Sequence, residues 1–154
     1  MRFMCYLIRI IFKKKYFLTK IRKKHIFYHR IGLKSILKTI FIVDDCDTNL
    51  ALAEDALEDY FCVLTVPSAS KMFSLLEKVT PDLILLDIEM PEMNGFEALE
   101  RLKASKTWAE IPVVFLTGTV DVSIESRSAQ LGAIGIITKP FSQSILVDRI
   151  NSYV

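Results

Sequence analysis

The chain has 154 residues, of which 51% are hydrophobic and 25% are charged. This length is enough for one domain around a single core. Its charge is unevenly divided: residues 1–39 hold 12 Lys and Arg and no acid, whereas residues 40–154 hold 8 basic and 18 acidic side chains. Both histidines, His25 and His29, lie in the basic part, so Ser-His-Asp and Cys-His catalysis are excluded from the acidic part.

Residues 1–38 are predicted to be an extension outside the globular domain. Residues 1–12 are apolar and precede three lysines, the reverse of a secretory signal, and the apolar part is too short to span a bilayer. One interpretation is a basic amphipathic segment that contacts an anionic membrane or nucleic acid. The interpretation we favour is a translated AT-rich upstream region, with the native start near Leu37. His25 and His29 have the spacing of zinc ligands, but no acid or cysteine lies nearby in the sequence to complete a site.

Five short apolar runs alternate with amphipathic segments in residues 39–154, the predicted globular domain. Short β-branched and aliphatic runs are typical of strands buried on both faces, as in a parallel sheet covered by helices. The expected strands are 39–43, 61–66, 81–86, 111–116 and 134–138. Because crossovers between parallel strands are right-handed, this alternation predicts an α/β fold with a doubly wound five-stranded sheet and five helices.

The expected helices begin at polar residues that favour helix starts or turns. These residues are Asp47, Ser68, the pair Asn94 and Gly95, Asp121, and Ser142. The first helix is expected to place Leu50, Ala53, Leu57 and Tyr60 on its inward face, and the fourth to end near Gly132.

Polar side chains follow four of the five strands, in the order acid pair, acid, hydroxyl and lysine. They are Asp44 and Asp45, Asp87, Thr117, and Lys139. The carboxyl ends of parallel strands form the ligand crevice in such sheets, so we expect these residues to meet there. Three carboxylates at one edge repel one another unless a cation is near, and Mg²⁺ prefers such oxygen ligands. Asp44 and Asp45 would then hold Mg²⁺, leaving Asp87 as a nucleophile toward phosphorus, with Lys139 and Thr117 as donors to the phosphoryl oxygens.

Four sequence blocks together resemble the receiver domain of response regulators in two-component signalling. The blocks are Asp44-Asp45, residues 87–95, Thr117-Gly118, and Lys139-Pro140-Phe141. The resemblance covers about residues 39–154, and the joint order of the blocks makes it specific, although each block alone is weak.

This resemblance implies a flavodoxin-like fold with strand order 2-1-3-4-5, and it implies a role for each matching residue. Asp87 would accept a phosphoryl group from a histidine kinase or histidine phosphotransfer protein. Asp45, Asp87 and the backbone carbonyl of Glu89 would ligate Mg²⁺, with Asp44 assisting through water. Lys139 would contact the phosphoryl group and Thr117 would be the switch residue. The peptide bond between Lys139 and Pro140 would be cis.

The sequence departs from the family pattern at one switch position. The family commonly has an aromatic residue, often tyrosine, three residues before the lysine, and here that residue is Ile136. Isoleucine offers neither a ring nor a hydroxyl, so phosphorylation is expected to be read out differently. Gly118 is small enough to let a phosphate approach, and Glu89 and Thr119 occupy positions that tune phosphoryl lifetime in the family.

The leading interpretation is a stand-alone receiver that catalyses its own phosphorylation and dephosphorylation, without an external substrate and without a DNA-binding domain. A degenerate receiver acting only as a binding adaptor is the alternative, supported mainly by Ile136. A haloacid dehalogenase phosphatase is set aside, because that family places its nucleophile on the first strand and its acid pair last. Three cysteines, Cys5, Cys46 and Cys62, form no CxxC, so a cytoplasmic protein with reduced thiols is expected.

Overall fold

The computed structural model describes residues 37–154, and within them five strands alternate with five helices. The predictions for residues 1–36 lie outside this described part. In chain order the elements are β1 (Thr39–Val43), α3 (Asp47–Leu57), β2 (Cys62–Val66), α4 (Ala69–Leu76), β3 (Leu83–Asp87), α5 (Gly95–Ala104), β4 (Val113–Thr117), α6 (Val122–Leu131), β5 (Gly135–Thr138) and α7 (Gln143–Asn151).

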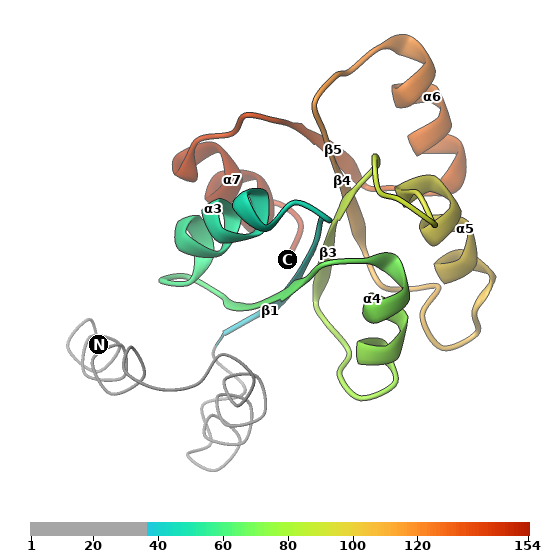
Figure 1. Cartoon of the computed structure of the whole chain (residues 1–154), viewed down its shortest axis with the longest axis horizontal. Coiled ribbons are helices and arrows are strands. Elements are labelled where there is room, and N and C mark those ends of the chain that lie inside the picture. The colour runs from blue at the N-terminus through green and yellow to red at the C-terminus, as the bar shows by residue number, and fades with distance from the viewer. Residues whose placement is uncertain (1–36) are drawn as a thin grey trace. The chain divides into compact units, whose positions relative to one another are not determined.

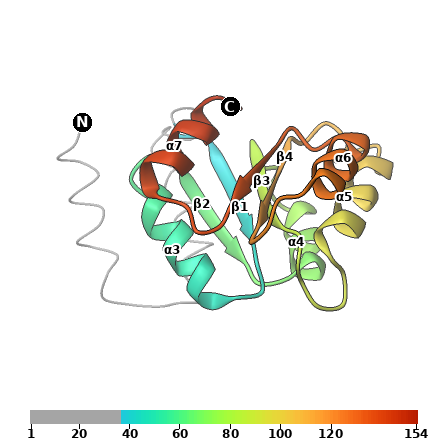
Figure 2. The same cartoon turned by 90° about the horizontal axis from the view of Figure 1, so that it is seen from above.

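All five strands are parallel and lie in the order β2-β1-β3-β4-β5 (Figures 1 and 2). The register brings the strand ends level, with Asp87 beside Leu116 and Thr117 beside Thr138. The predicted doubly wound sheet and its strand order are therefore confirmed.

Helices cover both faces of the sheet: α3 and α7 lie on one face, and α4, α5 and α6 on the other (Figures 1 and 2). Every residue of the inner strands β3 and β4 is buried, whereas the edge strand β5 has one buried residue, Ile137. This gradient follows from the sheet, because only an inner strand has neighbours on both sides as well as helices on both faces.

Side chains or backbone conformations suited to helix ends define most of the helix boundaries. Ser68, Asp121 and Ser142 accept hydrogen bonds from the first turns of their helices. Asn94 forms a reciprocal capping box with Glu97, an arrangement that fixes the start of α5. At its other end, α6 stops at Gly132, whose φ of 83° is the left-handed conformation that glycine adopts most readily.

Several element boundaries differ from the sequence predictions. The N-cap of α3 is Cys46, which makes no side-chain cap bond, and the predicted cap Asp47 is the first helical residue. Tyr60 is 50% exposed rather than inward, because α3 ends at Leu57. Four predicted strand starts also move. The start of β2 moves by one residue from Phe61 to Cys62, and that of β5 from Ile134 to Gly135. The start of β3 moves by two residues, from 81 to 83, and that of β4 from 111 to 113.

Candidate functional site

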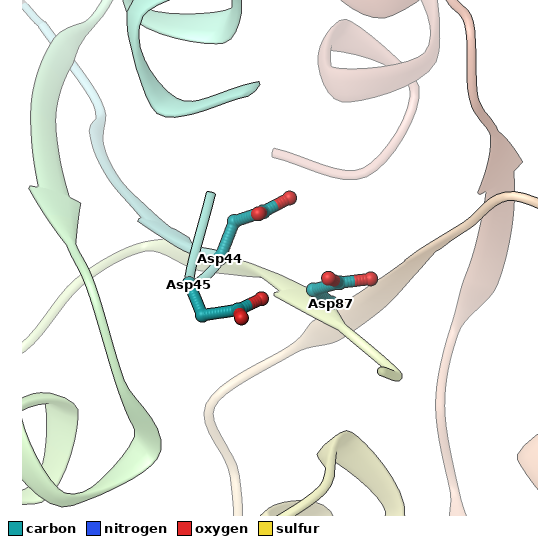
Figure 3. Close-up of side chains that lie close together, drawn as sticks. All are labelled: Asp44, Asp45 and Asp87. Carbon is teal, nitrogen blue, oxygen red and sulfur yellow. The ribbon is translucent and has the colours of Figure 1, made fainter. Parts of the chain in front are cut away.

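The polar residues at the strand ends meet at one edge of the sheet. Asp44 and Asp45 follow β1, Asp87 ends β3, Thr117 ends β4, and Lys139 follows β5. One carboxylate oxygen from each of the three aspartates lies within 4.8 Å of the others (Figure 3). Lys139 is ion-paired with two of them, Asp44 and Asp87.

Asp44 is fully buried and is held from three directions. Its carboxylate accepts hydrogen bonds from the backbone N–H of Cys46 at 2.8 Å and from the amide of Asn49 at 3.1 and 3.2 Å. The ammonium of Lys139 donates to Asp44 Oδ2 at 2.6 Å. Asp44 is therefore already neutralised and occupied, which leaves little free capacity for direct metal ligation.

Asp87 shares the same lysine in a water-poor environment. Lys139 Nζ lies 2.9 Å from Asp87 Oδ1, and these two side chains are 17% and 7% exposed. Burial raises the pKa of Asp87 above its ordinary value, against the lowering effects of Lys139 and the backbone hydrogen bond at Glu89; nearby Asp44 adds to the rise. Burial opposes the charge on Lys139, yet its hydrogen bonds to Asp44 and Asp87 prevail and raise the Lys139 pKa.

Asp45 is the exposed member of the three carboxylates, and in Figure 3 it lies beside Asp87. Lys139 pairs with Asp44 and Asp87, and no salt bridge within residues 37–154 includes Asp45. The carboxylate of Asp45 can therefore offer its oxygens to a cation that enters from solvent. A small hard cation that uses one or two carboxylates and keeps its other ligands from water or phosphate fits this donor set. The residues present are thus suited to Mg²⁺.

Thr117 is 1% exposed, and its hydroxyl is engaged with its own loop. It donates to the backbone carbonyl of Thr119 at 2.7 Å and accepts from the Thr119 N–H at 3.2 Å. Its neighbour across the sheet edge is Lys139, whose N–H donates to the Thr117 carbonyl at 2.7 Å. Any use of the Thr117 hydroxyl in the pocket requires it to leave Thr119.

Two further residues shape the pocket although sequence reasoning gave them no such role. Asn49 lies on the first turns of α3 and holds Asp44. Gly95 packs so closely on the end of β3 that an added Cβ would collide with the backbone carbonyl of Asp87 and lie 2.8 Å from Ile88 Cα. The Gly95 N–H donates to the Ile88 carbonyl at 2.9 Å, closing the loop between them. The Asn-Gly pair signalled a turn but not this close approach.

The remaining predicted positions surround the pocket. Ile136 is half-buried, pairs with Phe115 and packs against the cluster beneath α4, α5 and α6. The peptide bond between Lys139 and Pro140 is cis. No helix among residues 37–154 is long and apolar enough to cross a membrane.

The pattern of the response regulator receiver domain matches residues 40–151, and the chain belongs to this family. Over 116 residues it is 35% identical to a Vibrio cholerae protein named as a probable cyclic di-GMP phosphodiesterase, covering 75% of this chain and 26% of that protein. Over 118 residues it is 32% identical to the polar-differentiation response regulator DivK of Brucella ovis, covering 76% of this chain and 96% of that protein. The chain thus spans about a quarter of the first relative and nearly all of the second.

Solved structures agree with this family. The chemotaxis protein CheY4 of Vibrio cholerae superposes with a TM-score of 0.73 at 23% identity, covering 77% of this chain and 99% of that one, and shows the same fold. The phosphorylated cyanobacterial phytochrome response regulator RcpA superposes with a TM-score of 0.66 at 29% identity, covering 75% of this chain and 90% of that one. The described domain is a receiver domain of the kind used in two-component signalling.

Proposed function

We propose that this receiver is phosphorylated on Asp87 with Mg²⁺, as a switch in a two-component or phosphorelay system. The observation that carries the proposal is the convergence of Asp44, Asp45 and Asp87 on one sheet edge with Lys139 bonded to two of them. The pocket combines the buried carboxylate of Asp87, the exposed carboxylate of Asp45 and the ammonium of Lys139. Such a set is suited to phosphoryl transfer, in which negative charge on three phosphoryl oxygens must be neutralised.

Asp45, Asp87 and the backbone carbonyl of Glu89 are the proposed Mg²⁺ ligands, and Asp44 assists through water. The hydrogen bonds that already fill Asp44 support this division between the paired acids. When bound, the ion would offset the charge of the phosphoryl oxygens and of the crowded carboxylates.

In the proposed transfer, a carboxylate oxygen of Asp87 forms a bond to phosphorus while the nitrogen–phosphorus bond of a phosphohistidine donor breaks and the imidazole leaves. Lys139 lies 2.9 Å from Asp87 Oδ1, so its ammonium is positioned to follow the negative charge onto the phosphoryl group. Thr117 would then exchange the carbonyl of Thr119 for a phosphoryl oxygen. Hydrolysis by water restores the carboxylate of Asp87.

The proposed donor is a histidine kinase or a histidine phosphotransfer protein, and the receiver acts on itself rather than on an external substrate. That RcpA is described as phosphorylated supports this reading through the shared family. A cytoplasmic location is proposed to match such donors, and the thiol of Cys46, which forms no disulfide, fits it. The domain is proposed to comprise residues 39–154, with residues 1–38 as a separate extension.

The alternative, a degenerate adaptor, is less favoured because all five polar pocket residues are present. Incubation with acetyl phosphate and Mg²⁺, followed by intact-mass measurement, distinguishes the two. The proposed function predicts a phosphoryl adduct on the wild-type chain, loss of the adduct with a chelator, and none on Asp87→Asn. Equal labelling of both proteins, or no labelling of either, counts against phosphorylation of Asp87 as a switch.

A further inference from the structure

Helix α6 is attached to the domain by little burial. Ser128 is the buried residue within it, and its hydroxyl donates to the carbonyl of Ile124 in the same helix at 2.6 Å. Ile124 and Leu131 are half-buried against the core. A helix with so few buried side chains belongs to the easily opened part of a fold, so surface contacts weigh heavily in its position.

Arg127 provides such a contact from α6 to α5. Its guanidinium carbon lies 4.3 Å from the centre of the Phe96 ring, a cation–π geometry. One of its nitrogens lies 3.7 Å from Glu100 Oε1, and these two side chains are 52% and 53% exposed. An ion pair this exposed contributes little, so the stacking on Phe96 is the stronger half of the contact.

Phe96 connects this contact to the pocket. Its ring packs edge-on against Phe115, with centroids 5.1 Å apart, and Phe115 lies two residues before Thr117 on β4. The residue before Phe96 is Gly95, which packs directly against the carbonyl of Asp87. The Phe96 ring under Arg127 therefore lies between the backbone next to Asp87, the proposed phosphoryl acceptor, and strand β4, which carries Thr117.

We propose that Arg127 is a positioning residue that latches α6 onto α5 in the unphosphorylated state and is released in the phosphorylated one. This inference rests on the proposed function. In the present state the Thr117 hydroxyl bonds to the carbonyl of Thr119, which lies in the short loop between β4 and α6. Loss of that bond on phosphorylation would free the loop, and the proposal is that α6 then shifts relative to Phe96. Because Ile136 has no ring to report the switch, the guanidinium–phenyl contact transmits the state of the pocket to the surface.

A latch that favours one state must oppose the ligand that favours the other, because the coupling between them is reciprocal. Arg127→Ala is therefore expected to bind the phosphoryl mimic beryllofluoride, with Mg²⁺, roughly two- to fivefold more tightly than wild type. Without the mimic, the amides of α6 are expected to exchange faster with deuterium than in wild type.

The chain offers a matched control in Arg101→Ala. Arg101 also lies 4.3 Å over a phenyl ring, but that ring is Phe73, and within residues 37–154 Arg101 forms no hydrogen bond, ion pair or ring contact with α6. Glu100→Gln removes only the exposed ion pair, and Arg127→Lys keeps the charge but loses the planar stack. We expect wild-type behaviour from Arg101→Ala and Glu100→Gln, and an intermediate response from Arg127→Lys.

The experiment combines a beryllofluoride titration followed by fluorine NMR with hydrogen exchange of α6, both on the full chain. Tighter binding and faster α6 exchange confined to the Arg127 variants support the latch. Unchanged affinity in Arg127→Ala, or an equal effect of Arg101→Ala, overturns it. Failure of the wild type to bind beryllofluoride overturns the proposed function and the release step. In that case, deuterium exchange of the α6 amides without the mimic still decides whether Arg127 holds the helix.

Discussion

Lys139 and Asp44 lie 95 positions apart in the chain, yet Lys139 Nζ is 2.6 Å from Asp44 Oδ2, and the Asp44 side chain is 1% exposed. The same ammonium reaches Asp87, so one cation is ion-paired with two buried acids and offsets part of their charge. This shared lysine makes a pocket of three carboxylates compatible with a stable fold before any metal or phosphoryl group arrives.

Lys139→Ala should destabilise the domain by about 3 kcal/mol, because it leaves two buried carboxylates without their cation. Lys38→Ala is the matched control: it breaks a lysine–aspartate pair with Asp82 whose side chains are 55% and 38% exposed, and should cost no more than about 1 kcal/mol. Urea unfolding at pH 7 measures both. Similar losses in the two variants would contradict the role assigned to Lys139.

The same Lys139→Ala substitution should also alter the pH dependence of labelling. Lys139 lowers the pKa of Asp87, so its removal leaves burial less opposed and the pKa of Asp87 rises further. The reactive carboxylate then forms only at higher pH, and the rate of labelling by acetyl phosphate should fall first at the acidic end. The phosphoryl group should still bind, but with a weaker conformational response. A pH profile identical to wild type would contradict this explanation.

Asp87→Asn should stabilise the unphosphorylated domain at neutral pH. Burial raises the pKa of Asp87 in the folded state above its value in the unfolded chain. Protonated Asp87 therefore contributes to the folding stability fully below the unfolded pKa, and this contribution is lost as the pH rises through the folded pKa. At pH 7 the ionised side chain therefore lowers stability, and asparagine removes that cost.

The gain from Asp87→Asn should exceed the scatter of about 0.5 kcal/mol seen for surface substitutions and should shrink as pH falls toward 3. Thermal unfolding between pH 3 and 7 measures it, with Glu110→Gln as an exposed acid control. A lower stability of Asp87→Asn at pH 7 would show that the Lys139 pair outweighs the burial of Asp87.

Alanine at three glycines should give graded losses of stability. Gly95→Ala meets the fixed backbone of Asp87 and Ile88 and should cost about 1–3 kcal/mol, while also slowing the labelling of Asp87. Gly135→Ala meets the end of the Tyr153 side chain, which can swing aside, so its cost should be smaller. Gly118→Ala has nothing within 4 Å and should be nearly neutral. Chemical unfolding orders the three, and a different order would contradict the packing described at Gly95.

Thr117→Ala should separate labelling from response. Asp87 and Lys139 remain, so beryllofluoride should still bind, but the NMR shifts that it induces in α6 should be largely lost. Thr119→Ala is the control, since it keeps the backbone carbonyl that accepts from Thr117. Equal shift changes in α6 for Thr117→Ala and wild type would remove Thr117 from the switch.

Sequence patterns predicted the sheet and the residues at its strand ends because both depend on local composition and on the rule that the carboxyl ends of parallel strands share an edge. The strand order, in contrast, was implied by the resemblance to receiver domains and not by composition. The cap at Cys46 was missed because Cys46 caps through its backbone position, with no side-chain bond for a pattern to reveal. Tyr60 was misplaced because the helical stripe was extended one turn too far. The contacts of Asn49 with Asp44 and of Arg127 with Phe96 depend on side-chain directions that periodicity does not specify.

Phosphorylation of the Asp87 carboxylate is the central step of the proposed function. Treating the acetyl phosphate-labelled chain with borohydride, which reduces an acyl phosphate, and then mapping peptides by mass spectrometry locates the modified residue. We predict Mg²⁺-dependent reduction at Asp87 alone. Modification at Asp44 or Asp45, or an unmodified Asp87 in a labelled chain, would contradict phosphorylation of Asp87.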